Sequence, residues 1–156
     1  MKNGAEVRFN VEATPESIKA LNPYAVIVAA GGSSIIPPLE GVQQPHVCTV
    51  TEILNGTVSL KGKRVAVIGS GLTGLETAEK LAEDGNQIIV VEMLNQIGPD
   101  AFVQHLDDIL PRLNAYNVDF IVGQKLIKIT ASSIIMENTL SRQHSEENID
   151  YVVLSV

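Results

Sequence analysis

The stretch "RVAVIGSGLTGLETAEKLAEDG", residues 64–85, constrains the fold more than any other part of this chain. An apolar run from Val65 to Ile68 leads directly into three glycines and then into a helical pattern of Leu and Ala. Such a run is typical of a central parallel strand that helices cover on both faces. A second apolar strand, "QIIVVE", follows the helix closely, and parallel strands need a right-handed crossover. The stretch therefore predicts a strand, a helix and a parallel strand in one unit.

The three glycines open the predicted helix at the spacing G-x-G-x-x-G. Free N–H groups at a helix N-terminus, with the positive end of the helix dipole, favour a bound pyrophosphate. Gly69 allows a tight turn, Gly71 lets the backbone approach the pyrophosphate, and Gly74 lets the helix pack closely on the sheet. The spacing alone is weak evidence, but its place between strand and helix fits a dinucleotide site. We predict that a dinucleotide binds at Gly69, Ser70, Gly71, Leu72, Thr73 and Gly74.

An acidic residue at the end of the next strand, about 20 residues on, completes this fingerprint by binding the adenosine ribose hydroxyls. Glu92 closes "IIVVE" at about that position. A 2′-phosphate would be repelled by its carboxylate, and residues 81–111 contain no Lys or Arg to bind one. The sequence therefore predicts NADH, and not NADPH, as the ligand. Two alternatives stay open: glycines that serve only packing, and a strand-end glutamate that binds no ligand.

Composition and charge argue against several other functions. With 45% hydrophobic and 19% charged residues among 156, the chain can form one globular domain and part of a second. A net charge of −7 without a basic cluster argues against a nucleic-acid partner. The longest apolar run, "YAVIVAA", is too short to cross a membrane, and the first residues do not resemble a signal peptide. We therefore expect a cytoplasmic protein without membrane or nucleic-acid partners.

The sequence predicts no catalytic residue and no metal site. Its single cysteine, Cys48, cannot form an internal disulfide or a CxxC pair, so we expect an ordinary buried or half-buried side chain. His46, His105 and His144 are scattered and lack the spacing of metal ligands. No Ser/His/Asp arrangement stands out, and the Tyr-x-x-x-Lys pair of short-chain dehydrogenases is absent.

The N-terminal part of the chain has a weaker pattern. We expect strands over Glu6–Thr14 and Ala25–Ala29, with a helix between them that Thr14 caps and Pro15 begins. A proline-rich exit loop follows the second strand. We expect a linker over His46–Lys63, with a weak helical stretch around 51–54.

After the second buried strand, the pattern predicts a helix capped by Asp100, with Pro111 as a kink or as the start of a separate turn. A third strand, "VDFIV", follows. Alternating stretches "KLIKIT" and "SSIIMEN", a polar loop "TLSRQHSEEN" and a last strand "DYVVLSV" then predict a β-meander in place of a helical crossover. The predicted fold class is α/β, a Rossmann-like parallel sheet with a β-meander crossover.

Three stretches together resemble the pyridine nucleotide-disulfide oxidoreductase superfamily: "YAVIVAAGGSSIIPPLEG", "GKRVAVIGSGLTGLETAEKLAEDGNQIIVVEMLNQIG" and "DYVVLSV". In that superfamily an NADH-binding domain is inserted into an FAD-binding domain. The stretches "GLTGLETAEKLAEDG" and "VVEML" are most similar to NADH:flavin oxidoreductases of the old yellow enzyme class, such as 2,4-dienoyl-CoA reductase, enoate reductase and NADH oxidase-like proteins. Ala30 stands where the family normally has a threonine.

The resemblance implies that this chain is an excised segment of a longer flavoenzyme. The family's glycine fingerprint for the FAD pyrophosphate, its later Gly-Asp segment and its iron–sulfur cysteines are absent from this sequence. We expect residues 1–45 to be a fragment of the FAD-binding domain with its exit loop, and residues 46–156 to be the NAD(H)-binding Rossmann domain. Unpaired strand edges in the fragment make a homodimer one expected assembly.

Three functions are compatible with these observations. The first, implied by the resemblance, is a module that positions NADH for hydride transfer to FAD and onward to an enoate-type acceptor, with the remainder of the flavoenzyme chain as its partner. The isolated chain would then bind cofactor and catalyse little. The second is a stand-alone regulatory module that senses NAD(H). The third is a small NAD-dependent dehydrogenase, which would need a catalytic base that the sequence does not reveal.

Overall fold

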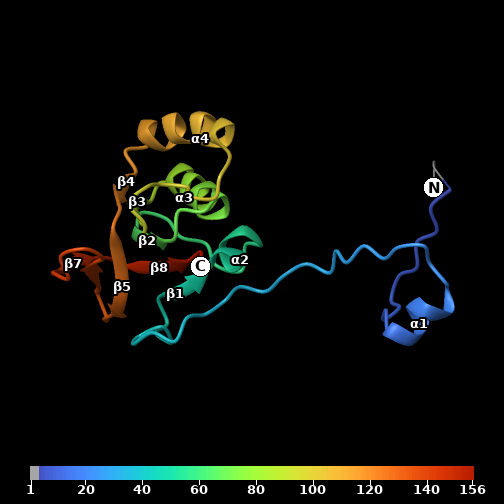
Figure 1. The fold of residues 1–156 in the computed structure, drawn as a ribbon. Helices are drawn as coiled ribbons and strands as arrows, with labels where there is room; N and C mark the ends of the chain where they lie inside the picture. Colours follow the sequence, from blue (N-terminus) through green and yellow to red (C-terminus); the bar gives the residue numbers. More distant parts are fainter. Residues whose placement is uncertain (1–3) are drawn as a thin grey trace. The chain divides into compact units, whose positions relative to one another are not determined.

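The computed structural model describes residues 4–156, which divide into two units: one ends at Gly32 and the other spans Ser33–Val156. Within the described residues, every strand belongs to the second unit (Figure 1). The first unit contains the short helix α1 (Pro15–Ala20). Thr14 caps this helix as the sequence predicts, and Ser17 completes a capping box with it.

The two strands that we expected in the first unit are not formed. Residues 6–14 and 25–29 have no strand assignment, and no described segment pairs with them. Their apolar side chains face solvent, and Ile27 is 91% exposed. Both segments contain the apolar residues that favour strands. A strand is stable only when it is hydrogen-bonded to neighbouring strands, however, and among the described residues these segments have no such neighbour.

The second unit is built on a five-stranded parallel sheet with the order β1-β8-β2-β3-β4. These strands are β1 (Val47–Thr49), β2 (Arg64–Ile68), β3 (Gln87–Val91), β4 (Asp119–Ile121) and β8 (Tyr151–Leu154). The helices of this unit are α2 (Val50–Leu54), α3 (Leu72–Glu83) and α4 (Val103–Ala115). The predicted strand, helix and strand are therefore β2, α3 and β3.

A second, antiparallel sheet with the order β5-β6-β7 connects β4 to β8. Its strands are β5 (Gln124–Ile129), β6 (Ser133–Asn138) and β7 (His144–Asn148). The predicted β-meander crossover and the α/β fold class are thus confirmed. The sequence predicts a polar loop over 139–148, but its second half forms β7. Because β7 is a largely exposed edge strand, its sequence lacks the apolar residues that would have indicated a strand.

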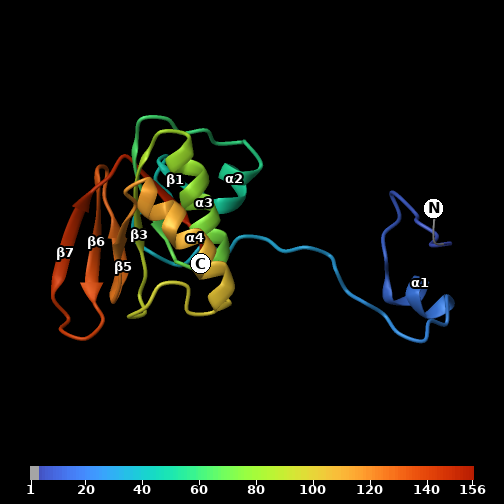
Figure 2. The same ribbon diagram turned by 90° about the horizontal axis from the view of Figure 1, so that it is seen from above.

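The main sheet separates two apolar cores. Val65 and Val67 of β2 face α3 and α4, whereas Ala66 and Ile68 face the antiparallel sheet. Figure 2 shows the helices on one side of β3 and the strands β5, β6 and β7 on the other. This burial on both faces explains why β2 has no alternation of apolar and polar residues.

The helix that the pattern of Leu and Ala predicts is α3. Leu75, Ala78 and Leu81 are buried on one stripe of the helix. Gly85 follows the helix at φ +87°, and its N–H donates to the Ala82 carbonyl oxygen at 2.9 Å. A residue in this left-handed conformation ends many helices, and glycine adopts it without steric cost.

Asp100 does not cap α4. It lies in a turn in which the Ala101 N–H donates to the Gly98 carbonyl oxygen at 3.0 Å. The N-cap residue is Phe102, which makes no side-chain hydrogen bond to the helix. Asp100 is of a residue type that often caps helices. The prediction is wrong because the chain forms one more turn before α4 begins at Val103.

Pro111 neither ends α4 nor starts a separate turn, because the helix continues through it to Ala115. Ile109 and Leu113, on either side of the proline, are buried in the core between the helices and the main sheet. This packing offsets the backbone hydrogen bond that proline cannot donate.

The stretch His46–Lys63 is not a linker. It forms β1 and α2, and the predicted short helix at 51–54 lies within α2. Cys48 of β1 lies opposite Val153 of β8 and is 6% exposed, as expected for a buried side chain. Burial, with a smaller contribution from Glu52, raises the pKa of the Cys48 thiol to about 11. The linker prediction failed because the partner of β1 is about one hundred residues away in sequence.

Candidate functional site

The strand order of the main sheet reverses at β2. The chain continues from β2 to β3 on one side, and β8 later pairs with the other side of β2. Ligands of open α/β sheets bind at such a reversal, beyond the carboxyl ends of the strands. A cleft of about 820 Å³ opens there, and the ends of β2, β3 and β8 form its floor.

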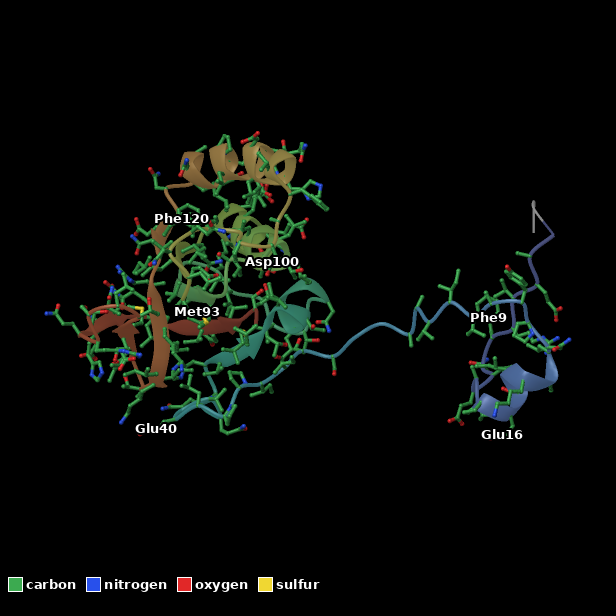
Figure 3. All side chains as sticks on the ribbon, in the orientation of Figure 1. Phe9, Glu16, Glu40, Met93, Asp100 and Phe120 are labelled. Carbon is green, nitrogen blue, oxygen red and sulfur yellow. The ribbon has the colours of Figure 1, made fainter. Side chains whose placement is uncertain are left out.

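Three segments form the walls of this cleft: residues 37–39, the loop after β3, and residues 124–127 of β5. Figure 3 labels Met93 at the start of the loop after β3 and Asp100 toward its end. Most of the wall is apolar, including Met93, Leu94 and Ile127. The shape and lining suit a flat, partly apolar ligand with a few polar groups.

The glycine-rich turn has the backbone geometry that a dinucleotide site requires. Gly69 has φ +101°, and a Cβ there would collide with the carbonyl oxygen of Ser155. A Cβ on Gly74 would collide with the carbonyl oxygen of Gly69. A Cβ on Gly71, in contrast, would meet no atom within 4 Å, and Gly71 lines the cleft. The close packing of the turn therefore requires glycine at positions 69 and 74, whereas Gly71 leaves open space for a ligand.

The N-terminus of α3 lies at this turn. Gly71 is the N-cap residue and provides no side-chain hydrogen bond, and the first turn carries no acidic side chain. The first N–H groups of a helix have no partner within the helix. With the helix dipole, they favour an anion such as a pyrophosphate. The residues present therefore fit the phosphate part of a dinucleotide.

Glu92 directly follows β3, is 6% exposed and lines the same cleft. Its Oε2 accepts hydrogen bonds from the Ser70 N–H at 2.9 Å and the Ser70 hydroxyl at 2.7 Å. Its Oε1 accepts one from the Leu94 N–H at 2.9 Å. Burial alone would raise the pKa of this carboxyl, but these donors, with the Met93 N–H, outweigh it and the pKa is lowered. Glu92 is therefore held as a carboxylate.

The structure brings together part of the predicted site. Gly69, Ser70, Gly71 and Glu92 line the cleft. The other three predicted residues do not line it: Gly74 is buried beneath the turn, Leu72 is half-buried and Thr73 is exposed. Backbone N–H groups of these three residues still belong to the first turn of α3.

The sequence did not identify the far wall of the cleft. Gln124 and Lys125 come from β5, in the second sheet, and no local pattern connects them with the glycine-rich turn. The Gln124 N–H donates to the Glu92 carbonyl oxygen at 3.0 Å. Lys125 is a cation in the cleft, and it lies outside residues 81–111, which contain no Lys or Arg. The expectation that no cation is available near the site is therefore wrong, and the predicted preference for NADH rests on Glu92 alone.

Two negative observations apply to residues 4–156. No cluster of three or more His, Cys, Asp or Glu side chains is placed to hold a metal ion. No helix in this range combines the length and the apolar character needed to cross a bilayer.

Comparisons with known proteins agree over nearly the whole chain. Among curated proteins it is 41% identical over 151 residues to a bilirubin reductase of Mediterraneibacter gnavus, covering 97% of this chain and 23% of that protein. It is 31% identical to a cinnamate reductase of Clostridium sporogenes, covering 98% of this chain and 23% of that one. The chain thus spans about a quarter of the length of these relatives.

A solved structure of a 2-naphthoyl-CoA reductase in complex with 2-naphthoyl-CoA superposes with a TM-score of 0.80 at 28% identity, covering 99% of this chain and 23% of that one. The family model for pyridine nucleotide-disulphide oxidoreductases matches residues 4–156. The cofactors of this family are NAD(H) and FAD. The chain therefore belongs to the pyridine nucleotide-disulphide oxidoreductase family.

Proposed function

We propose that this chain is the NADH-binding module of a flavin-dependent oxidoreductase of the old yellow enzyme class. The observation that carries the proposal is the open space at Gly71, beside the N-terminus of α3 and in one cleft with Glu92. A nucleotide with a diphosphate and a ribose needs these two features at this spacing. The same proposal places the protein in the cytoplasm.

In this proposal the residues of the chain bind and orient the nucleotide. The N–H groups of the first turn of α3 hold the diphosphate, and the Glu92 carboxylate accepts hydrogen bonds from ribose hydroxyls. The apolar wall around Met93 excludes water from one side of the ligand. When bound, NADH supplies a hydride, for which FAD and then an enoate-type compound are the acceptors in the intact enzyme. The match to a cinnamate reductase supports this acceptor class, because cinnamate is an enoate.

We further propose that residues 1–45 are a fragment of the FAD-binding domain and that residues 46–156 are the NAD(H)-binding domain. The exposed apolar side chains of the first unit, among them Phe9 and Ile27, support this assignment, since such surface is normally covered by a packed neighbour. In the intact enzyme the remainder of the flavoenzyme chain would cover it. In isolation, a homodimer is the assembly that would cover it instead.

A titration of the purified chain with NADH, NADPH and FAD tests this function. We expect calorimetry to show binding of NADH, weaker binding of NADPH and no retention of FAD, because the cleft offers one nucleotide site and a carboxylate that repels a 2′-phosphate. Tight binding of FAD would contradict the proposed assignment of the N-terminal fragment. The absence of any nucleotide binding would contradict the proposed function.

Removal of the Glu92 carboxylate tests the ribose assignment. We expect Glu92→Ala to weaken NADH binding by about 1–3 kcal/mol, because ribose hydroxyls in the cleft would lose their acceptor. The preference for NADH over NADPH should narrow, since the carboxylate that would repel a 2′-phosphate is removed while Lys125 remains in the cleft. Glu83→Ala, which removes a carboxylate outside this cleft, is the matched control for changes in net charge. NADH binding equal to that of the parent chain would show that the ribose assignment is wrong.

A further inference from the structure

Ser70, the second residue of the glycine-rich turn, has a fully buried side chain that joins two loops. Its hydroxyl donates to Glu92 Oε2 at 2.7 Å and accepts from the Gly98 N–H at 3.0 Å. The Ser70 backbone N–H donates to the same carboxylate oxygen. One small side chain therefore connects the turn after β2, the acid after β3 and the loop that leads toward α4.

These contacts leave the two carboxylate oxygens of Glu92 in different states. A carboxylate has about four acceptor positions, two on each oxygen. Oε2 takes both of its hydrogen bonds from Ser70, whereas Oε1 accepts the Leu94 N–H. The Met93 N–H also acts on this carboxylate, but it makes no hydrogen bond of comparable geometry to it. The larger remaining capacity for a ligand hydroxyl therefore lies on Oε1.

On the basis of the proposed function, we propose that Ser70 is a positioning residue for nucleotide selectivity: its hydroxyl fixes Glu92 so that Oε1 is presented to the ribose hydroxyls of NADH. Without this hydroxyl, Oε2 would keep a single donor and the Gly98 N–H would lose its acceptor. The carboxylate would then be held by the Ser70 and Leu94 N–H groups alone and would be less restricted in its orientation, and the loop after β3 would lose its contact with the Ser70 hydroxyl. Both changes should reduce the preference of the site for the ribose 2′-hydroxyl of NADH over the 2′-phosphate of NADPH.

Another buried hydroxyl in the same region provides a matched control. Thr77 of α3 is also fully buried, but its hydroxyl donates to the Thr73 carbonyl oxygen within the same helix, at 2.7 Å. Thr77→Val removes that hydrogen bond and keeps the shape of the side chain. This variant therefore shows how the loss of a buried hydroxyl affects stability and binding when the hydrogen bonds of Glu92 are unchanged.

The experiment compares the affinities of the 156-residue chain for NADH and NADPH. We expect Ser70→Ala to raise the Kd for NADH by about tenfold and to lower the NADH-to-NADPH affinity ratio by a similar factor. Ser70→Gly, which removes the same hydroxyl with less bulk, is a second variant in case the first does not fold. Thr77→Val should leave the affinity ratio unchanged. A parental ratio in a folded Ser70 variant would overturn the proposal.

A double-mutant comparison separates positioning from a general structural effect. If Ser70 acts through Glu92, Ser70→Ala should have little further effect on nucleotide binding in a Glu92→Gln background. An equal loss in both backgrounds would overturn the proposal. Retention of NADH binding by Gly71→Val would instead contradict the proposed function itself, so the two failures can be told apart.

The pH profile gives a readout that loss of packing alone would not move. Loss of a hydroxyl donor raises the pKa of a buried carboxylate, so the decline of NADH affinity at acid pH should begin at a higher pH in Ser70→Ala than in the parent. The other charged side chains that line the cleft, Asp100 and Lys125, are the same in both chains, so they contribute equally to the two profiles. Superimposable profiles would contradict the proposed role of Ser70.

Discussion

Gly71→Val should abolish NADH binding while the chain keeps its fold. A Cβ at this position meets no protein atom within 4 Å, so the valine side chain enters the space that the proposed ligand needs. Gly71 has φ −58° and ψ 165°, a conformation that valine adopts readily. Loss of a glycine N-cap costs at most about 1 kcal/mol. The loss of affinity should exceed about 100-fold, or roughly 2.7 kcal/mol, measured by calorimetry.

The matched control for this variant is Gly32→Val. Gly32 also has open space around its Cβ position and no positive φ, but it does not line the cleft. This variant should bind NADH as the parent does. Thermal unfolding of both variants shows whether the fold is intact. A folded Gly71→Val chain that binds NADH with parental affinity would place the diphosphate elsewhere.

The central part of the fold could be predicted from the sequence because its information is local. Residues 64–92 contain the strand, the turn glycines, the helix stripe and the terminal acid in one continuous stretch, and each feature limits the next. The role of Gly74 depends in part on a contact that is short-range in sequence, the approach of this residue to the Gly69 carbonyl oxygen. Here local and tertiary requirements agree.

The elements that the sequence did not predict depend on distant partners. β1 is a strand because β8 pairs with it, and β7 is a strand because β6 does, although neither has a clear apolar alternation. Residues 25–29 of the first unit show the opposite case. They have the composition of a buried strand, but no described segment pairs with them. Strand formation requires both a suitable segment and a neighbour, and a local pattern reports only the first.

The site shows the same division. The position of Glu92 after β3 could be predicted from the sequence, but its hydrogen bonds to Ser70 and Leu94 could not. The far wall, with Lys125, lies in the cleft only because the β-meander returns to the carboxyl ends of the main sheet. The sequence therefore indicated which cofactor class to expect, whereas the contacts of the groups that we propose to control selectivity required the tertiary structure.

Gly74→Ala should destabilise the chain by about 2–3 kcal/mol. A Cβ there would lie against the Gly69 carbonyl oxygen, and within 2.9 Å of Ser155 Oγ. The serine side chain can rotate away, but the carbonyl belongs to a turn that the φ of +101° at Gly69 holds in place. Alanine favours a helix over glycine by about 1 kcal/mol, so the steric cost has to exceed this gain.

Gly71→Ala is the matched control for this prediction, because both substitutions add one methyl group to the same glycine-rich motif. Gly71→Ala meets open space, so its free energy of unfolding should stay within about 1 kcal/mol of the parent value. Urea unfolding followed by circular dichroism measures both variants under identical conditions. If Gly74→Ala were as stable as Gly71→Ala, the close approach of α3 to the turn after β2 would be wrong. The proposed site would then lose its geometric basis, since this approach places the N-terminus of α3 at the turn that lines the cleft.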